Sequence, residues 1–266
     1  MKYNFEFFTA NEDFQESSVG LIIHLLKESV LNITKCGPVE PCKTDFNEKN
    51  SNLIFKYFSG RIILTGHTKD VKVEALCGFD WFTGITRWGF TIESKKILNR
   101  DYFDNILFLL KSLQSQIPII YGLISSFNEY DCLHKETIHF EGGGSSEGYN
   151  GVSNQDFTEF LPGVYWFNFY GEALTLAFGA KNIKTVPNVI YADIDKAVTA
   201  FYLPGNADID NFDDRLAEIR KVRQYIGEEY FYDFVNVDKI KFSHPLRFKK
   251  FLTNVQQKFL QRHNRL

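Results

Sequence analysis

The sequence has few cysteines and no long apolar run, and these two absences narrow the class of protein. Its 266 residues include four cysteines, too few and too scattered for a disulfide framework in a chain of this length. The first residues lack the apolar stretch of a signal peptide, and nowhere do about 18 apolar residues follow one another, as a membrane span requires. We therefore expect a cytoplasmic protein without membrane association.

Large apolar side chains, by contrast, are plentiful. The chain contains 27 Phe and 13 Tyr, and 44% of its residues are hydrophobic, which is enough for a sizeable core. Its length exceeds the usual domain size of roughly 100 to 200 residues. One large domain and two fused smaller domains both remain open on this ground.

Charge is distributed unevenly, although the net charge is only −3. Residues 239–266 carry eight Lys or Arg and no Asp or Glu, so residues 1–238 hold 22 basic and 33 acidic residues and a net charge of −11. Residues 127–160 contain seven carboxylates against Lys135 alone. This stretch would attract a basic partner and repel nucleic acid.

Hydrophobic periodicity predicts strands and helices in mixed order. In the first half we expect a strand over 3–10, a helix over 19–30, a hairpin from 53–58 and 61–66, strands at 71–79 and 88–93, a helix over 101–113 capped by Asn99 or Asp101, and a buried strand over 119–127. In the second half we expect an aromatic strand within 161–171, a short helix over 171–179, a pair of strands within 188–203, and helices over 210–226 and 245–263.

This order indicates an α+β fold with mixed or antiparallel sheets and packed helices. A Trp-bearing strand followed by a helix and another strand occurs in both halves, which leaves open an arrangement of two similar lobes. The expected division is an N-terminal α+β lobe (1–140), a Gly/Ser-rich loop (141–154) and a C-terminal α+β lobe with a basic terminal helix (155–266). A single continuous domain is the alternative.

Metal and phosphate sites are not expected. Cys132, His134, His139 and Glu141 are residues of metal-ligand type, but their spacing matches no zinc signature, so we predict no metal and no cofactor. The glycines of 142–145 lack the Gly-Lys-Ser/Thr ending of a phosphate-binding loop and are surrounded by carboxylates. We interpret them as part of a flexible loop.

Two alternatives with other chemistry stay open. Ser59 lies beside Gly60 but on no recognisable nucleophile turn, whereas Asp193 and Asp195 lie two residues apart and would face the same side of a strand. A hydrolase with a non-standard carboxylate site is therefore one alternative. The other is a nucleic-acid-associated protein that uses the basic helix over 245–263, although packing of that helix on the acidic body is the simpler interpretation.

The most distinctive segment runs from 161 to 179 and reads LPGVYWFNFYGEALTLAFG. Its Pro162, Gly163, Tyr165, Trp166 and Asn168 resemble the Pro-Gly-aliphatic-Tyr-Trp-x-Asn-aromatic strand of bacterial polymorphic-toxin immunity proteins, most closely the immunity protein 52 family. The resemblance covers about 75 residues, including the following strands, the helix over 210–226 and the aromatic run after it. These motif positions are expected to hold the fold and not to contact a partner.

The resemblance implies a protein that binds a cognate toxin, expected to be a nuclease, and blocks it by covering its surface without catalysing a reaction. Acidic side chains suit a basic nucleic-acid-binding surface, so charge and expected exposure select the candidates. The first group of candidate toxin-binding residues is Glu129, Asp131, Glu136, Glu141 and Glu147, and the second is Asp208, Asp210, Asp213 and Asp214.

Overall fold

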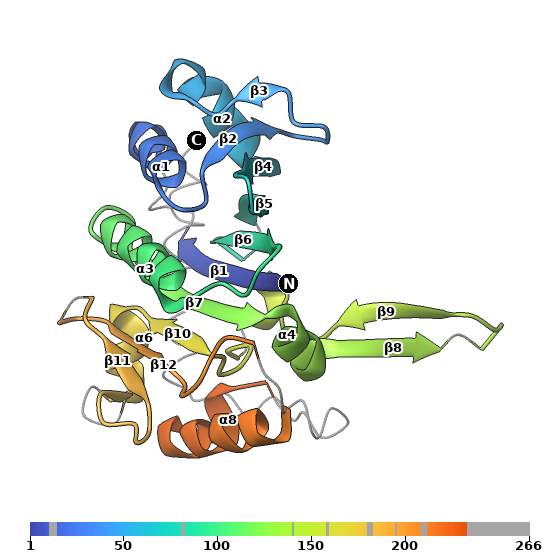
Figure 1. Cartoon of the computed structure of the whole chain (residues 1–266), viewed down its shortest axis with the longest axis vertical. Coiled ribbons are helices and arrows are strands. Elements are labelled where there is room, and N and C mark those ends of the chain that lie inside the picture. The colour runs from blue at the N-terminus through green and yellow to red at the C-terminus, as the bar shows by residue number, and fades with distance from the viewer. Residues whose placement is uncertain are drawn as a thin grey trace.

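The fold is built around one wide antiparallel sheet (Figure 1). The computed structural model describes residues 1–10, 15–80, 83–139, 141–157, 160–179, 183–194, 196–208 and 212–232. Within them, ten strands form a sheet in the order β11-β12-β10-β7-β1-β6-β5-β4-β2-β3, and β8 and β9 form a separate hairpin. The expected helix over 245–263 lies outside the described residues.

The strands of the ten-stranded sheet come from both sides of residues 141–154, so one sheet runs through the two segments. The strands are β1 (Lys2–Ala10), β2 (Ile33–Gly37), β3 (Thr44–Asp45), β4 (Ile62–His67), β5 (Val71–Asp80), β6 (Ile85–Ser94), β7 (Ile119–Ser126), β8 (Lys135–His139), β9 (Ser145–Tyr149), β10 (Phe167–Tyr170), β11 (Ile190–Ala192) and β12 (Thr199–Tyr202). The helices are α1 (Glu16–Glu28), α2 (Ser51–Phe58), α3 (Arg100–Gln114), α4 (Phe127–His134), α5 (Asn154–Phe157), α6 (Glu172–Phe178) and α8 (Phe212–Ile226). The predicted α+β class is confirmed.

One face of the sheet is covered by the N-terminal helices. In β1 the residues Phe5 and Phe7 share this face, and Phe7 stacks on Trp88 of β6 with ring centroids 5.2 Å apart. Phe58 of α2 packs against the same indole at 5.0 Å, and Phe103 of α3 reaches Tyr3 at 5.5 Å. Aromatic pairs across adjacent strands therefore set the register of β1 and β6.

The opposite face of the sheet centre is covered by α4 and α5. Phe8 of β1 points to this side and stacks on Phe157 of α5 at 4.4 Å. Helices therefore lie over both faces of the sheet at β7, and every residue of β7 is buried. Glu6 points to the same side as Phe8, so this face carries a charged group into the interior.

Two expectations about individual elements are wrong. Residues 53–58, expected to be a strand, lie in helix α2, where Ile54 and Phe58 are buried four residues apart on one side. A short apolar run does not separate helix from strand by periodicity alone. Residues 145–149, expected to be loop, form strand β9, because pairing with β8 imposes an extended backbone on Ser and Gly residues of low strand propensity.

The described helices are too short or too polar to cross a bilayer.

The capping of α3 follows the expectation, because the side chain of Asn99 accepts a hydrogen bond from the backbone N–H of Tyr102 at 3.2 Å. Asn99, not Asp101, is therefore the N-cap.

Trp88 gives a direct test of this core. Its side chain is 1% exposed, and its indole N–H donates to the hydroxyl of Thr9 at 3.1 Å. We expect Trp88→Ala to lower the free energy of unfolding by about 3–5 kcal/mol, measured by urea denaturation. Phe108, 67% exposed on α3, is the matched control, and Phe108→Ala should change it by less than about 0.5 kcal/mol. Similar losses for both variants would contradict this packing.

Candidate functional site

The β8–β9 hairpin is exposed to solvent along almost its whole length. Every residue of β8 is exposed, and so is every residue of β9 except the half-buried Gly148. Figure 1 shows the hairpin extending away from the sheet and the helices that cover it. The pairs run from Lys135 with Tyr149 to His139 with Ser145. A hairpin held out in this way can be reached by another macromolecule from both faces.

Four of the five first-group candidates lie on this hairpin or at its base. Glu136, Glu141 and Glu147 are exposed. Asp131, at the base in α4, is half-buried and accepts a hydrogen bond from the hydroxyl of Tyr149 at 2.8 Å. Lys135 is the hairpin's lysine, and its ammonium group lies 2.9 Å from the Glu147 carboxylate. The structure thus gathers three exposed carboxylates and one ammonium group on the projecting hairpin, with a fourth carboxylate at its base.

Glu129 is the exception, and its assignment to the surface is corrected. Its side chain is fully buried in α4, where one carboxylate oxygen accepts from the backbone N–H of Trp166 at 3.3 Å. The other oxygen lies 3.7 Å from the guanidinium of Arg215 in α8. Burial raises the pKa of Glu129 to about 7, and the charge of Arg215 offsets part of this increase. Glu129 joins elements inside the fold and does not face a partner.

The sequence around α4 contains a pattern that indicates the burial of Glu129. Ser126 and Glu129 form the Ser-x-x-Glu spacing of a helix start, and the Ser126 hydroxyl does accept from the backbone N–H of Glu129 at 3.1 Å. Glu129 and Leu133 are then four residues apart on the same side of α4, and both are buried. The net charge of residues 127–160 does not record this helical periodicity.

The second group of candidates is dispersed. Asp208 is half-buried and accepts from the Tyr3 hydroxyl at 2.8 Å. Asp213 and Asp214 are exposed in the first turn of α8, where carboxylates suit the positive end of the helix dipole. Asp210 lies outside the described residues. The structure does not bring Asp208 and the α8 pair onto the hairpin.

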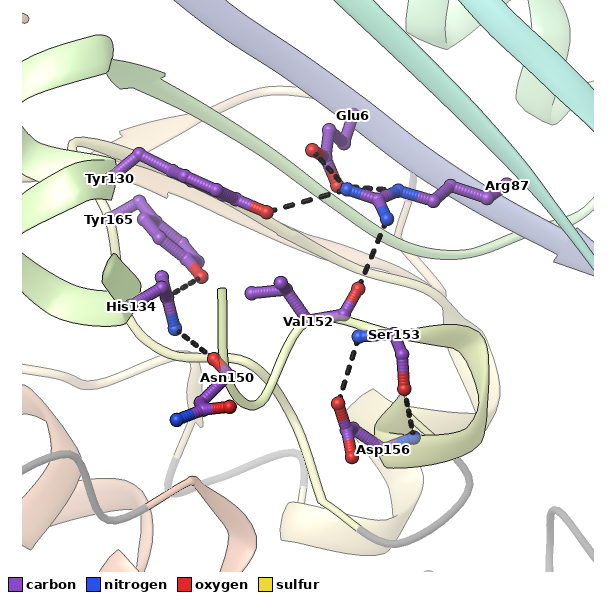
Figure 2. Close-up of polar contacts among 9 residues, drawn as sticks. All are labelled: Glu6, Arg87, Tyr130, His134, Asn150, Val152, Ser153, Asp156 and Tyr165. Carbon is purple, nitrogen blue, oxygen red and sulfur yellow. Dashed lines mark hydrogen bonds and ion pairs between the residues drawn. The ribbon is translucent and has the colours of Figure 1, made fainter. Parts of the chain in front are cut away.

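His134 closes the base of the hairpin (Figure 2). Its ring nitrogen Nδ1 lies 2.8 Å from the carbonyl oxygen of Asn150, and Nε2 lies 2.7 Å from the hydroxyl of Tyr165. Because a carbonyl can only accept, Nδ1 carries the proton and Nε2 accepts from Tyr165. Burial lowers the pKa of His134 to about 4, so the ring is neutral at pH 7. The sequence alone brought this histidine forward only as a residue of metal-ligand type.

A partly buried ion pair lies beside this histidine (Figure 2). Arg87 of β6 binds both carboxylate oxygens of Glu6 with its Nε and Nη2 atoms, at 3.1 and 2.7 Å. Its Nη1 donates to the carbonyl of Val152 at 3.1 Å, and Nη2 lies 3.4 Å from the hydroxyl of Tyr130. A bidentate guanidinium thus ties the sheet to α4 and to the segment that follows the hairpin.

The segment that follows the hairpin is held in place by capping hydrogen bonds and by a glycine. Ser153 and Asp156 cap α5 reciprocally, because the backbone N–H of each donates to the side chain of the other at 2.9 and 3.0 Å. Gly151 has a φ of +74°, and a Cβ there would lie 2.4 Å from the ring of Tyr232. Only glycine satisfies both conditions. The chain therefore leaves the hairpin along one defined path.

The motif residues within 162–168 contact the base of the hairpin through Tyr165 and His134. Pro162, Gly163, Tyr165, Trp166 and Asn168 are all buried. The Asn168 side chain accepts from the backbone N–H of Tyr165 at 2.9 Å and donates to its carbonyl at 2.7 Å, so a local turn precedes β10. The indole N–H of Trp166 donates to the Gly205 carbonyl at 3.0 Å. Their contacts lie within the chain.

Of the residues considered for catalysis, the structure describes Ser59 and Asp193, which lie in separate exposed segments. In the described part of the chain no group of three His, Cys, Asp or Glu side chains could hold a metal ion. Ser59 ends α2, exposed, with its hydroxyl donating to the carbonyl of Lys56 at 2.7 Å. Asp193 is exposed, and Asp195 lies outside the described residues.

The class defined by this geometry is an α+β protein with an open antiparallel sheet and an anchored, acidic hairpin. No family model matches the chain, and no curated protein matches it. Among solved structures, the Pseudomonas aeruginosa T6SS protein PA0821 aligns with 97% of this chain and 84% of its own, with a TM-score of 0.47 and 9% identity. That likeness is distant.

Two buried titratable groups near the hairpin should have opposite effects on how the free energy of unfolding changes with pH. His134 normally has a pKa of 6.5 and is lowered to about 4, so between these values the unfolded chain binds more protons and stability rises with pH. Glu129 normally has a pKa of 4.5 and is raised to about 7, so there the folded chain binds more protons and stability falls with pH. Between pH 4.5 and 6.5 the two contributions oppose each other.

We therefore expect two variants to diverge from the native protein in opposite directions. Relative to the native protein, Glu129→Gln should gain stability across this window by about 2–3 kcal/mol as pH rises, because the opposing contribution is removed. His134→Gln should lose a similar amount over the same range. Urea denaturation at three pH values measures both slopes, and other titrating groups cancel in the comparison. Parallel curves for all three proteins would contradict the assigned ionisation of both groups.

Proposed function

We propose that the protein is an immunity protein that binds and neutralises a cognate bacterial toxin by covering its surface, without catalysing a reaction itself. The observation that carries this proposal is the β8–β9 hairpin, which is exposed, acidic and fixed at its base by buried groups. An exposed ribbon of this kind contributes little to the core. Its position and charge suit contact with a positively charged partner protein.

The partner we propose is a nuclease toxin, and the inhibitor would act in the cytoplasm. Surfaces that hold DNA or RNA are rich in Lys and Arg, because they neutralise phosphates. A set of carboxylates on a projecting element can occupy such a surface and accelerate association electrostatically. The segment 161–179, which resembles the immunity protein 52 family, supports the same assignment because its buried side chains hold the hairpin's base.

The alternative of a hydrolase finds less support in the contacts. Glu129 has a raised pKa, which is a common feature of catalytic acids. Its carboxyl group, however, is fully buried between Trp166 and Arg215 and is not exposed to a substrate. The candidate carboxylates on the hairpin are solvated and apart from it.

Co-expression tests the proposal. The toxin encoded beside this protein is induced in cells with and without it, and viable cells are counted. We expect rescue, a one-to-one complex on a sizing column, and stoichiometric loss of nucleic-acid cleavage by the purified toxin. Absence of both rescue and complex would refute the proposed function.

Charge variants locate the interface. We expect the double variant Glu136→Gln with Glu147→Gln to weaken toxin binding by about tenfold, mainly through slower association at low salt. The matched control removes two exposed carboxylates from α1, as Glu16→Gln with Glu28→Gln, and should bind within about twofold of the native protein. Surface plasmon resonance at two ionic strengths gives the rates. Equal effects of both double variants would move the interface away from the hairpin.

A further inference from the structure

We infer that the outer edge of β9 accepts an extended, positively charged strand of the partner, which pairs with it as a third strand of the hairpin. This inference rests on the proposed function for the identity of the partner. It adds the mode of recognition, in which main-chain hydrogen bonds supply affinity and alternating side chains supply selectivity.

The hydrogen-bond pattern identifies which backbone groups of β9 point outward. The backbone N–H of Asn150 donates to the carbonyl of His134 at 2.9 Å, in register with the pairs of the hairpin. Bonded and non-bonded pairs alternate along an antiparallel ribbon. The pairs of Glu136 with Gly148 and Ile138 with Ser146 are therefore bonded, and the backbone groups of Ser145, Glu147 and Tyr149 face outward from β9.

The two edges of the hairpin are not equivalent. On β8 the backbone N–H of Lys135 already donates to the Asp131 carbonyl at the end of α4, so the helix takes the first outward donor. A lysine on an edge also discourages the addition of a strand. On β9 the sequence SSEGY contains neither Lys nor Pro, and in the described chain no other strand pairs with its outer side. The available edge is that of β9.

Side chains on this edge specify the partner's charge. Residues paired directly share a face, and alternate residues of one strand do as well, so Glu147 and Tyr149 lie on the same face of β9. Their exposure is substantial, because Glu147 has 64% of its side chain exposed and Tyr149 is 41% exposed. A strand with Arg or Lys at alternate positions would place one cation beside the carboxylate and another over the phenol ring.

Charge also argues against a second copy of this chain as the occupant. If two β9 edges paired antiparallel about Glu147, the two carboxylates would lie directly opposite each other, which is unfavourable in a strand pair. Glu136 and Glu141 add negative charge to the same element. A basic strand from another protein avoids this pairing of carboxylates, and its cation competes with Lys135, 2.9 Å away, for the Glu147 carboxylate.

The isolated ribbon gains most from a third strand. A two-stranded hairpin with neither face covered is marginal in water, and three strands are needed for independent stability. Here the base of the ribbon is already ordered by His134, Asn150 and Tyr165. Less conformational entropy is therefore lost when a strand is added than for a free loop of the same length.

The test uses the full chain and a synthetic probe. The probe is an eight-residue peptide of alternating Arg and Thr with blocked termini, and a second peptide carries Glu in place of Arg. Binding is followed by nuclear magnetic resonance titration and by amide hydrogen exchange of the protein. We expect the Arg peptide alone to bind and to slow exchange of the Ser145, Glu147 and Tyr149 amides by about tenfold or more.

Two proline variants are matched across one strand pair, because Thr137 and Glu147 are direct partners whose backbone groups face opposite edges. Glu147→Pro removes an outward donor from β9 and should abolish probe binding. Thr137→Pro does the same on β8 and should change the probe's Kd by less than about twofold. Glu147→Gln, which keeps the edge and removes the charge, should weaken binding by about fivefold.

Several results would overturn the inference: equal binding of the Glu peptide, protection on β8 instead of β9, or equal effects of the two proline variants. Failure of the inference and failure of the proposed function are distinguishable. If Glu147→Pro still forms the toxin complex and rescues cells as well as the native protein, inhibition stands and strand addition is wrong. If the probe protects β9 but the native protein gives no rescue, the edge site stands and the toxin assignment is wrong.

Discussion

The direction of the β8–β9 hairpin depends on one neutral histidine. The backbone N–H of His134 belongs to the end of α4, so it is not available to pair across the ribbon; the ring N–H donates to the Asn150 carbonyl instead. The same ring accepts from Tyr165, which belongs to the segment leading into β10. One side chain therefore connects the helix, the hairpin and the sheet, and burial keeps its ring neutral at pH 7.

The groups around this histidine are polar and at least partly buried, which makes their arrangement specific. Glu6 and Arg87 form a bidentate pair, and the Nη1 atom of the guanidinium donates to the Val152 carbonyl. Removing one partner from such a cluster leaves a charge without compensation, whereas an intact cluster permits one geometry. The fold thus uses polar contacts below the hairpin to fix direction, and aromatic contacts on the opposite face, such as Phe7 on Trp88, for cohesion.

Much of the fold could be predicted from the sequence, because long periodic segments carry a clear signal. The helix capped by Asn99 and the continuous apolar strand at 119–126 are examples. Short segments were harder. Residues 53–58 are apolar enough for either helix or strand, and residues 145–149 are poor strand formers that become a strand through pairing.

The candidate site was predicted in part. Glu136, Glu141 and Glu147 lie on one exposed element, as their charge suggested, but Glu129 in the same acidic stretch points into the core. The difference comes from position on a helix, which net charge does not record. His134 could not have been recognised from sequence, because its role depends on Asn150 and Tyr165, which reach it only after folding.

The separation between the hairpin and its anchor has an evolutionary consequence. Side chains beyond Lys135 on one strand and before Tyr149 on the other touch little of the body, so their replacement costs little folding stability. Substitutions at the tip of this element can then accumulate while the scaffold stays constant. A lineage with this architecture can change the surface of the hairpin through a few codons without rebuilding its core.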